Sequence, residues 1–290
     1  MSRKKRILVA GATGYLGGYV ASGALDKGYR VLALARDRAK AEALEAKGAE
    51  ILVADACDRS SLTGQFEAVD VLVSSIGLRS MKASPSFEEV DFRANMNLLE
   101  EGLAAGVGHF IFVSVLKGEQ LRGSIPLFDA RERVVDALKV SGMKYTVVRP
   151  NGFFNDMAAM FIMAKQGRFV ILGKGDTRIN PIHGKDLARS ILDSIEDESR
   201  WFSEYDIGGP ETFTLKEIGE LAYECLGRKP QYYYLPTSLL SFSATVCAPF
   251  NKNAASILRA MAQMGSARDM LAPRYGEESL RDFFKKLAAC

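Results

Sequence analysis

A glycine-rich turn between the first apolar run and the first helical pattern constrains this chain more than any other feature. Ile7–Ala10 has the composition of a buried strand and leads directly into Gly11-Ala-Thr-Gly14-Tyr-Leu-Gly17. A pattern typical of a helix follows, to Asp26. A strand, a tight glycine turn and a helix N-terminus together let the backbone approach a pyrophosphate closely, and the helix stabilises its charge. We therefore predict a dinucleotide site whose contacts include Gly11, Thr13, Gly14, Tyr15, Leu16 and Gly17.

The residues after the second apolar run indicate which dinucleotide binds. Proteins that bind NAD usually carry an acidic side chain there for the ribose hydroxyl, whereas proteins that bind NADP carry a cation for the phosphate. Arg30–Ala35 ends with Ala35 at the expected position of the acid, and Arg36, Asp37 and Arg38 follow. A guanidinium can pair with phosphate and stack on adenine. We predict NADP(H) rather than NAD(H), bound through Arg36 and Arg38, and we expect Asp37 to cap the next helix.

Short apolar runs alternate with helical patterns through the first half of the chain, which is typical of βαβ units. Several runs are apolar on both faces, as in strands covered by helices on both sides. The predicted fold is α/β, a Rossmann-type doubly wound parallel sheet. The expected strands are Arg6–Ala10, Arg30–Ala35, Ile51–Ala54, Val69–Ser74, His109–Ser114 and Lys144–Arg149. The expected helices between them are Arg38–Lys47, Phe87–Ala105 and Ala130–Val140.

The strict alternation ends at Pro150, after which helical patterns with irregular connections follow. We predict an NAD(P)-binding domain over residues 1–150 and a smaller, mainly helical substrate-binding lobe over residues 151–290, with the chain crossing back to the sheet. Amphipathic helices are expected at Ala254–Gln263 and Glu277–Leu287.

One segment of this lobe, Gln231–Asn251, carries no charge. Its length could cross a bilayer, but Pro236, Pro249 and several Ser and Thr residues interrupt it. We expect a buried or substrate-facing helix and no integral membrane span. Peripheral contact with a membrane stays open as the alternative.

Composition excludes several classes of function. The chain is 48% hydrophobic and 25% charged with a net charge of +3, so it lacks the concentrated basic surface that nucleic-acid binding requires. The four cysteines are widely spaced, without a CxxC pair or a nearby histidine, so we expect no metal site, no disulfide framework and a reducing cytoplasmic location. These cysteines are Cys57, Cys225, Cys247 and Cys290.

The chain resembles the atypical short-chain dehydrogenase/reductase superfamily, in particular its NmrA-like and divinyl-reductase-like members. The resemblance covers nearly the whole chain, and the order of the blocks is more specific than any one block. The blocks are Gly11–Gly17, Ala54–Ala56, Ser75–Gly77, Phe112–Ser114, Tyr145–Pro150, Asn180–His183 with Lys185–Ala188, and Ile207–Pro210.

The resemblance implies further cofactor contacts. Asp55 and Ala56 would lie beside the adenine, and Ser75, Ile76 and Gly77 would line the ribose and nicotinamide. Pro150 and Phe153 belong to a segment that would close over the nicotinamide. His183 is expected to hold a loop rather than to carry protons, because no relay partner is near it in sequence.

The catalytic helix departs from the family pattern. Related reductases use a Ser with a Tyr-x-x-x-Lys pair, in which Tyr is the acid/base and Lys lowers its pKa. Ser114 is present, but Leu127 falls at the Tyr position and Arg131 at the Lys position. Arginine can hold ribose or phosphate but is a poor proton donor. Lys117 is a candidate acid, and a proton from water or from the substrate is the alternative.

The second lobe is expected to supply an apolar substrate surface through Phe154, Asn155, Met157 and Met160. The resulting prediction is a reductase, monomeric or homodimeric, that uses NADPH on an apolar carbonyl, enone, quinone or vinyl-bearing ring. The alternative is a protein that binds NADP(H) without catalysis, as a redox sensor or as an assembly or scaffold protein. The absence of the Tyr and Lys of the catalytic helix favours this alternative.

Overall fold

The computed structural model describes residues 3–289, so Cys290 lies outside the described residues. The chain divides into two compact units. Unit 1 runs to Arg79 and also contains Ser84–Arg149 and Leu187–Tyr205. Unit 2 contains Ser80–Ala83, Pro150–Asp186 and the chain from Asp206 onward.

Unit 1 is built on a seven-stranded sheet with the order β3-β2-β1-β4-β5-β6-β9. The pairs from β3 to β6 are parallel and in continuous register. The strands are β1 (Arg6–Ala10), β2 (Arg30–Ala35), β3 (Glu50–Val53), β4 (Val71–Ser74), β5 (His109–Val113), β6 (Lys144–Pro150) and β9 (Ser203–Ile207). The predicted Rossmann-type sheet is confirmed, with β9 as an additional edge strand.

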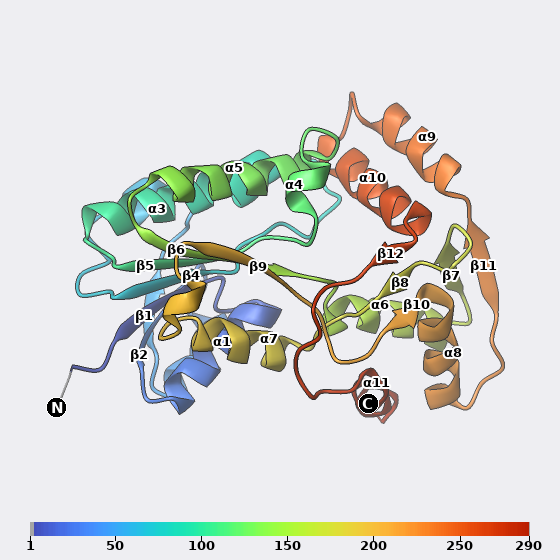
Figure 1. Cartoon of the computed structure of the whole chain (residues 1–290), viewed down its shortest axis with the longest axis horizontal. Helices are drawn as coiled ribbons and strands as arrows, with labels where there is room; N and C mark the ends of the chain where they lie inside the picture. Colours follow the sequence, from blue (N-terminus) through green and yellow to red (C-terminus); the bar gives the residue numbers. More distant parts are fainter. Residues whose placement is uncertain (1–2, 290) are drawn as a thin grey trace. The chain divides into compact units, whose positions relative to one another are not determined.

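Helices cover both faces of this sheet. Figure 1 shows α3 and α5 on one face and α1 and α7 on the other. The helices are α1 (Tyr15–Asp26), η1 (Arg38–Ala41), α2 (Glu42–Ala46), η2 (Arg59–Ser61), η3 (Glu88–Arg93), α3 (Ala94–Ala104), α4 (Gly118–Leu121), α5 (Pro126–Val140), α7 (Gly184–Asp193) and η4 (Glu198–Arg200). The helix expected at Phe87–Ala105 begins as the π-helix η3, whose wider turns carry the buried Asp91.

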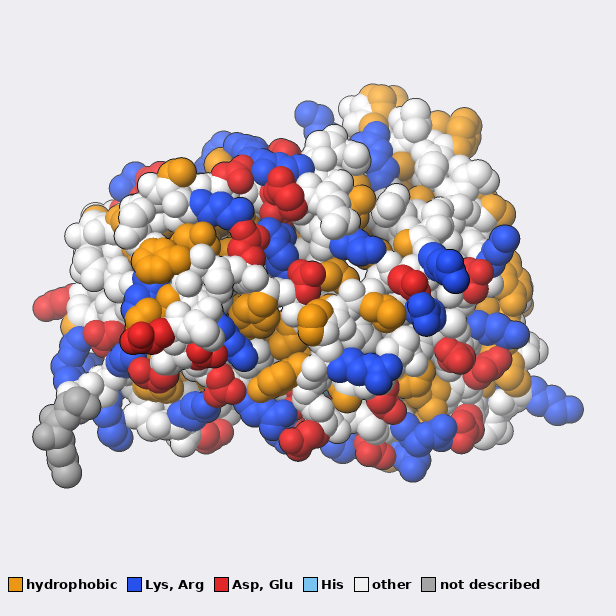
Figure 2. Space-filling view, in the orientation of Figure 1, with side chains coloured by type: hydrophobic (Ala, Val, Ile, Leu, Met, Phe, Trp, Pro, Cys, Tyr) orange, Lys and Arg blue, Asp and Glu red, His pale blue; other side chains and the backbone are white. Residues whose placement is uncertain are grey.

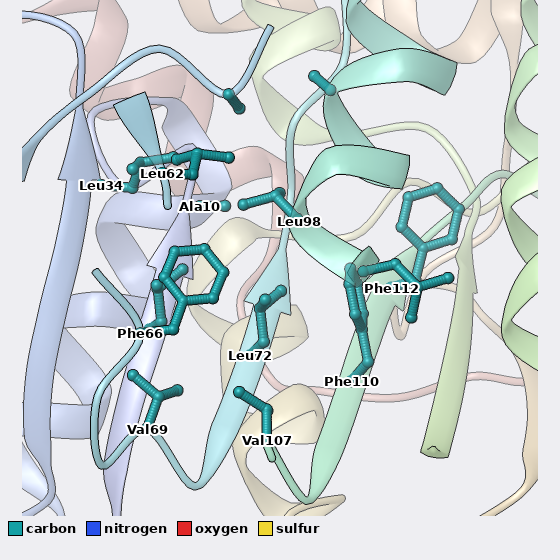
Figure 3. Close-up of a cluster of buried hydrophobic side chains, with 14 of the residues drawn as sticks. Ala10, Leu34, Leu62, Phe66, Val69, Leu72, Leu98, Val107, Phe110 and Phe112 are labelled. Atoms are coloured by element: carbon teal, nitrogen blue, oxygen red, sulfur yellow. The ribbon is translucent and has the colours of Figure 1, made fainter. Parts of the chain in front are cut away.

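One hydrophobic core of unit 1 lies between the sheet and the face formed by α3 and α5. Leu72 and Phe110 of the central strands are fully buried, as are Leu98 of α3 and Val134 of α5. Figure 3 shows the strand side chains and Leu98 converging in one layer with Phe66. Because both faces of the strands are covered, their sequences are apolar throughout rather than alternating, and this packing holds the carboxyl ends of the strands in place.

Unit 2 combines helices with two small sheets of order β10-β8-β12 and β11-β7. Its strands are β7 (Phe169–Leu172), β8 (Arg178–Ile179), β10 (Phe213–Thr214), β11 (Tyr232–Leu235) and β12 (Asp269–Met270). Its helices are α6 (Phe154–Lys165), α8 (Leu215–Leu226), α9 (Thr237–Cys247), α10 (Lys252–Ser266) and α11 (Leu280–Ala288). A separate core of Phe161, Phe169, Tyr223 and Phe284 holds these elements together.

The uncharged segment Gln231–Asn251 is expected to form a buried or substrate-facing helix, and the structure contradicts the burial. It forms β11 and then α9, and the break between them falls at Pro236. Only Leu240 and Ala244 of α9 are buried, because the helix packs on α10 along one side. The absence of charge therefore reflects an exposed apolar surface and not burial.

Among residues 3–289, none of the helices has both the length and the apolar character that a bilayer-spanning segment requires. In the same residues no group of His, Cys, Asp and Glu side chains is arranged to hold a metal ion. Cys57, Cys225 and Cys247 are free thiols.

Candidate functional site

The glycine turn closes on itself at the carboxyl end of β1. Gly11 has a φ of +82°, and the Gly14 amide donates to the Gly11 carbonyl at 2.9 Å. A Cβ on Gly17 would lie 2.1 Å from that same oxygen, so a side chain there would force the turn to move. α1 begins at Tyr15 with no side-chain cap and no acidic residue in its first turn. No side-chain cap and no acidic side chain therefore offsets the positive end of its dipole, an arrangement suited to phosphate.

The predicted contacts within this turn differ in accessibility. Thr13 and Gly14 are exposed, whereas Leu16 is buried on the sheet side of α1. The ring of Tyr15 is half-buried and stands edge-on against Tyr19, with 5.4 Å between the ring centres. The exposed backbone of the turn and the ring of Tyr15 thus form its outer surface.

The segment after β4 closes one side of the turn. The amide and the hydroxyl of Ser75 both donate to the carbonyl of Ala10, at 3.1 and 3.2 Å. A Cβ on Gly77 would lie 1.8 Å from Nη2 of Arg131, so the absence of a side chain at Gly77 lets the guanidinium approach the backbone. Ile76, between them, packs partly against the core.

The segment after β2 presents its two arginines differently. Arg38 forms an ion pair with Glu45, whereas within residues 3–289 no acidic side chain pairs with Arg36. Asp37 accepts a hydrogen bond from the Ala39 amide at 3.0 Å and so caps the next helix, as predicted. Arg36 is exposed. Its guanidinium is therefore available for an anion, and that of Arg38 is already bonded.

Asp55 follows β3 on the strand next to β2. Its carboxylate accepts from the Cys57 amide at 3.0 Å, which closes a turn. Burial raises the pKa of the Cys57 thiol to about 11, and Asp55 adds to this effect while the charge of Arg36 opposes it. Ala56 is buried, and its carbonyl accepts from Asn97 at 2.9 Å. Asp55 and Arg36 thus lie near one thiol, at the carboxyl ends of adjacent strands.

Arg131 is held by groups of the protein itself. Its Nη2 forms an ion pair with Oδ1 of Asp91 at 2.7 Å, and Nη1 donates to the carbonyl of Val113 at 2.8 Å. The Asp91 side chain has no solvent exposure, and its Oδ2 accepts from the Leu78 amide at 3.0 Å. Arg131 therefore joins α5, η3 and the segment after β4 at the edge of the glycine turn.

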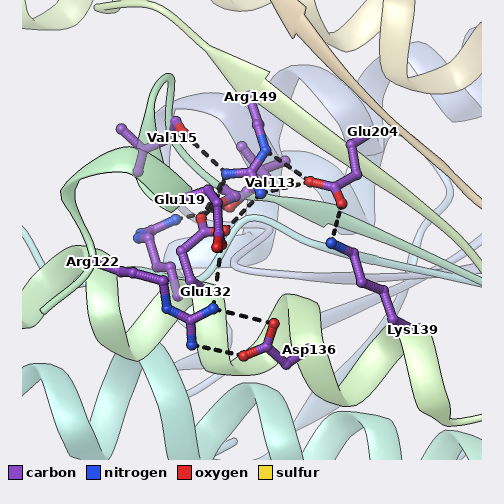
Figure 4. A network of polar contacts seen from close by, with 11 residues as sticks. Val113, Val115, Glu119, Arg122, Glu132, Asp136, Lys139, Arg149 and Glu204 are labelled. Atoms are coloured by element: carbon purple, nitrogen blue, oxygen red, sulfur yellow. Dashed lines mark hydrogen bonds and ion pairs between the residues drawn. The ribbon is translucent and has the colours of Figure 1, made fainter.

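The hydroxyl of Ser114 donates to Oε1 of Glu132 at 2.9 Å. Glu132 belongs to a second network, which Figure 4 shows together with Arg149, Glu204 and Lys139. Both terminal nitrogens of Arg149 donate to Glu132 at 2.6 Å, and Nη2 also donates to Glu204 at 2.6 Å. Lys139 pairs with Glu204 at 2.5 Å. Burial alone would raise the pKa of Glu204, but hydrogen bonds from Lys139 and Arg149 lower it. The Ser114 hydroxyl is thus a donor to a buried carboxylate.

The remaining residues of the predicted catalytic region lie around α4 and α5. Lys117 is partly exposed, has a φ of +58° and directly precedes α4. Leu127, at the position of the family tyrosine, is partly exposed, and Phe128 beside it is buried.

The predicted substrate residues belong to unit 2. Phe154 and Met157 are 1% and 5% exposed and form part of its core, so their side chains are occupied by packing. Met160 packs partly against the same core, whereas Asn155 is exposed. A contact of these four with a substrate stays a prediction. Phe153 precedes α6, and its amide donates to Asp156.

Pro150 ends β6 and is buried. His183 accepts from the Lys185 amide through Nδ1 at 3.1 Å, and it packs edge-on against Phe154. Burial lowers its pKa. The histidine holds the start of α7, as predicted.

Sequence reasoning missed the acidic partners of the buried arginines. Glu132 is part of a helix whose pattern marks no special role, but Arg149 at the end of an apolar strand is a signal, since a buried guanidinium requires carboxylates.

Arg79, after β4, was missed as well. Burial and the positive charge of Arg131 lower the pKa of Arg79, while Tyr15 opposes them. A second cation therefore lies near Arg131 and the glycine turn.

The chain is similar in sequence and in fold to several known proteins. The chloroplastic divinyl chlorophyllide a 8-vinyl-reductase of Arabidopsis thaliana is 28% identical, over 97% of this chain and 76% of that protein. The photosystem II assembly factor Ycf39 of Guillardia theta is also 28% identical, over 81% of this chain and 75% of that protein. The solved NADPH-dependent quinone oxidoreductase of Escherichia coli, in complex with NADPH, matches with a TM-score of 0.77 at 22% identity, covering 97% of this chain and 99% of that one.

This structural likeness confirms the Rossmann-type fold. The model of the NmrA-like family matches residues 3–272, nearly the whole chain. The chain therefore belongs to the NmrA-like family, as its sequence blocks predict.

Proposed function

We propose that this protein is a reductase that uses NADPH to reduce an apolar carbonyl, enone, quinone or vinyl-bearing ring. The observation that carries the proposal is the glycine turn with Arg36 beside it. The turn can close tightly because Gly17 lacks a Cβ, and the guanidinium of Arg36 has no acidic partner among residues 3–289.

The residues present fit NADPH. In this proposal the turn and the N-terminus of α1 hold the pyrophosphate. Arg36 binds the 2′-phosphate, since Ala35 replaces the acid that would bind a ribose hydroxyl. Asp55 and Ala56 lie on the adenine side, and Ser75 to Gly77 line the ribose and nicotinamide. A bound NADPH supplies a hydride. The solved quinone oxidoreductase with NADPH supports this choice of cofactor.

The chain's own residues restrict how the proton is delivered. Arg131 is paired with Asp91, Ser114 donates to Glu132, and Leu127 has no proton to give. We therefore propose that Ser114 and Arg131 shape the nicotinamide end and transfer no proton. The proton comes from Lys117, from water or from the substrate. A conjugated acceptor suits this arrangement, because the one proton that balances the hydride can be taken from water after hydride transfer.

One relative is named as a vinyl reductase, and one solved structure is named as a quinone oxidoreductase. Both names indicate conjugated acceptors. They support an acceptor of this class for this chain. Met160, which is partly accessible, and the exposed Asn155 are the proposed acceptor side of α6, since Phe154 and Met157 are buried in the core of unit 2.

A second function is favoured by the same bonding of Ser114 and Arg131. A protein that binds NADP(H) without turnover, as a redox sensor or an assembly or scaffold subunit, needs no free catalytic side chain. The match to the assembly factor Ycf39 supports this alternative.

Cofactor titration and turnover separate the two functions. We expect NADPH to bind more tightly than NADH, and oxidation of NADPH, followed at 340 nm, with at least one of a panel of quinones, enones and porphyrins. Tight NADPH binding without turnover on every acceptor of the panel would support the non-catalytic alternative.

The cofactor assignment has its own pair of variants. Arg36→Ala is expected to weaken NADPH binding by about 10- to 100-fold with little effect on NADH, because a charged hydrogen bond contributes about 1.5–3 kcal/mol. Arg38→Ala is the matched control, since Arg38 is paired with Glu45. If Arg36→Ala keeps the preference for NADPH, the assignment of the 2′-phosphate to Arg36 is wrong.

A further inference from the structure

One face of α9 exposes a continuous row of apolar side chains. Leu239, Phe242, Val246 and Phe250 are 50%, 67%, 53% and 85% exposed. Their spacing of three or four residues places them on one side of the helix and of the turn that follows it. We call these four residues the α9 stripe. Isolated exposed apolar residues are ordinary on protein surfaces, but a contiguous row indicates a binding surface.

The apolar surface extends beyond the helix within unit 2. Tyr233 and Tyr234 of β11 are each 55% exposed and directly precede α9 in the chain. At the other end of the stripe, Asn251 donates to the carbonyl of Met81 at 2.8 Å. This bond holds Met81, which is 46% exposed, close to the chain at Phe250. Figure 2 shows hydrophobic side chains along the edge that α9 and β11 occupy in Figure 1.

The charged residues on this stretch of the chain are all of one sign. Between Cys225 and Arg268 the chain contains five basic residues and no acidic residue. Asn253 also donates to the carbonyl of Lys82 at 2.7 Å, which brings another cation to the start of α10, beside Lys252. The five basic residues are Arg228, Lys229, Lys252, Arg259 and Arg268. An exposed apolar row on a segment that carries basic residues and no acidic residue is complementary to an apolar phase under a negatively charged surface.

We propose that the α9 stripe binds peripherally to the surface of an anionic lipid bilayer. α9 then lies in the headgroup region, with its Phe and Leu side chains among the upper acyl chains and the tyrosines at the interface. Lys82 and Lys252 contact the anionic headgroups. At 11 residues the helix is much shorter than the roughly 20 residues that cross a bilayer, so it lies on the membrane. Between the apolar residues, the Thr245 hydroxyl donates to the carbonyl of Ser241 at 3.0 Å, so this polar group is satisfied within the helix.

Vesicle flotation with the full-length chain tests this proposal. We expect it to float with vesicles of phosphatidylcholine and phosphatidylglycerol at low salt, to float much less with phosphatidylcholine alone, and to lose binding as the salt concentration rises. Phe242→Ser is expected to weaken binding by about 10-fold or more, because burial of a Phe side chain is worth about 1.5–3 kcal/mol. Lys252→Gln is expected to weaken it by about fivefold.

Val140→Ser is the matched control, because Val140 is 86% exposed in unit 1, outside the α9 stripe. Circular dichroism and NADPH titration of each variant show that the fold and the cofactor site are intact, which separates this proposal from the proposed reductase function. The proposal is overturned if the chain does not float with anionic vesicles, or if Phe242→Ser floats as well as Val140→Ser. It is also overturned if light scattering shows a dimer that Phe242→Ser dissociates while neither form binds vesicles, because the stripe is then an interface between two copies.

Discussion

Arg131 donates to a buried carboxylate and to a main-chain carbonyl, and Ser114 donates to a second buried carboxylate. Each donor already has a strong acceptor within the protein, so removing it would leave a buried acceptor unsatisfied. At the scale of single residues, these two side chains therefore support the shape of the site. Gly17 also supports the shape of the site, because it has no side chain that would meet the Gly11 carbonyl.

Gly17→Ala is expected to weaken NADPH binding at least 10-fold and to lower the free energy of unfolding by about 1–3 kcal/mol, because the added Cβ would meet the Gly11 carbonyl. Gly18→Ala is the matched control, since its Cβ would lie 3.5 Å from the nearest atom, the carbonyl of Ala12. That variant is expected to be neutral or more stable by about 0.5–1 kcal/mol. Fluorescence titration and urea unfolding measure both effects, and equal behaviour of the two variants would contradict the role of Gly17.

At the scale of elements, α5 is tied to the sheet by a buried ion network. Glu132 on α5 has no side-chain exposure, and Arg149 on β6 is 8% exposed. The same helix forms an exposed ion pair, Asp136 with Arg122, whose side chains are 51% and 29% exposed. Buried and exposed pairs differ in energy, since a charge left unpaired in the interior cannot be hydrated.

Glu132→Gln is expected to lower the free energy of unfolding by about 3–5 kcal/mol, because it leaves the Arg149 guanidinium with one carboxylate fewer. Asp136→Asn on the same helix is expected to change it by about 1 kcal/mol or less. Urea denaturation followed by circular dichroism compares them. A loss for Glu132→Gln no larger than that for Asp136→Asn would show that the network adds little to stability.

At the scale of the whole molecule, stability depends on pH through a buried histidine. His109 at the start of β5 is 3% exposed, and its Nε2 is 2.9 Å from the hydroxyl of Thr146. That hydroxyl donates to the carbonyl of Arg200, so it accepts from a neutral ring that carries its proton on Nε2. Burial, together with the charges of Lys144 and Lys5, lowers the pKa of His109 to about 4.

The unfolded chain therefore binds a proton at His109 that the folded chain does not, over the pH range from about 6.5 down to about 4. The free energy of unfolding is expected to fall across this range by about 3 kcal/mol from His109. His109→Gln should flatten the dependence more than His183→Gln does. Urea denaturation at pH 7, 5.5 and 4 measures this, and an unchanged slope in His109→Gln would refute it. The contribution of Glu204 is lost only below its usual pKa of about 4.5, because its folded-state pKa is lowered.

The elements that the sequence predicts well have strong local signals. β1 and β2 end where predicted, because apolar runs stop at a glycine and at a charge. Asp37 caps its helix as predicted, since the cap needs only neighbouring residues. The π-helix η3 was missed because nothing in its local pattern distinguishes it from an α-helix. The segment of α9 was predicted as a buried or substrate-facing helix, and the burial was wrong because composition alone cannot tell whether a partner element covers an apolar face.

The sequence by itself determined the glycine turn and the order of strand and helix around it, because both depend on backbone sterics and local hydrogen bonds. It also shows directly which residue follows β2. Only the tertiary structure decided which charges are free. Arg38 is bonded to Glu45, Arg131 to Asp91 and Ser114 to Glu132, whereas Arg36 has no acidic partner among residues 3–289. These pairings join residues that are up to 40 positions apart, and the strength of an ionic contact depends on the distance and burial that only the fold sets.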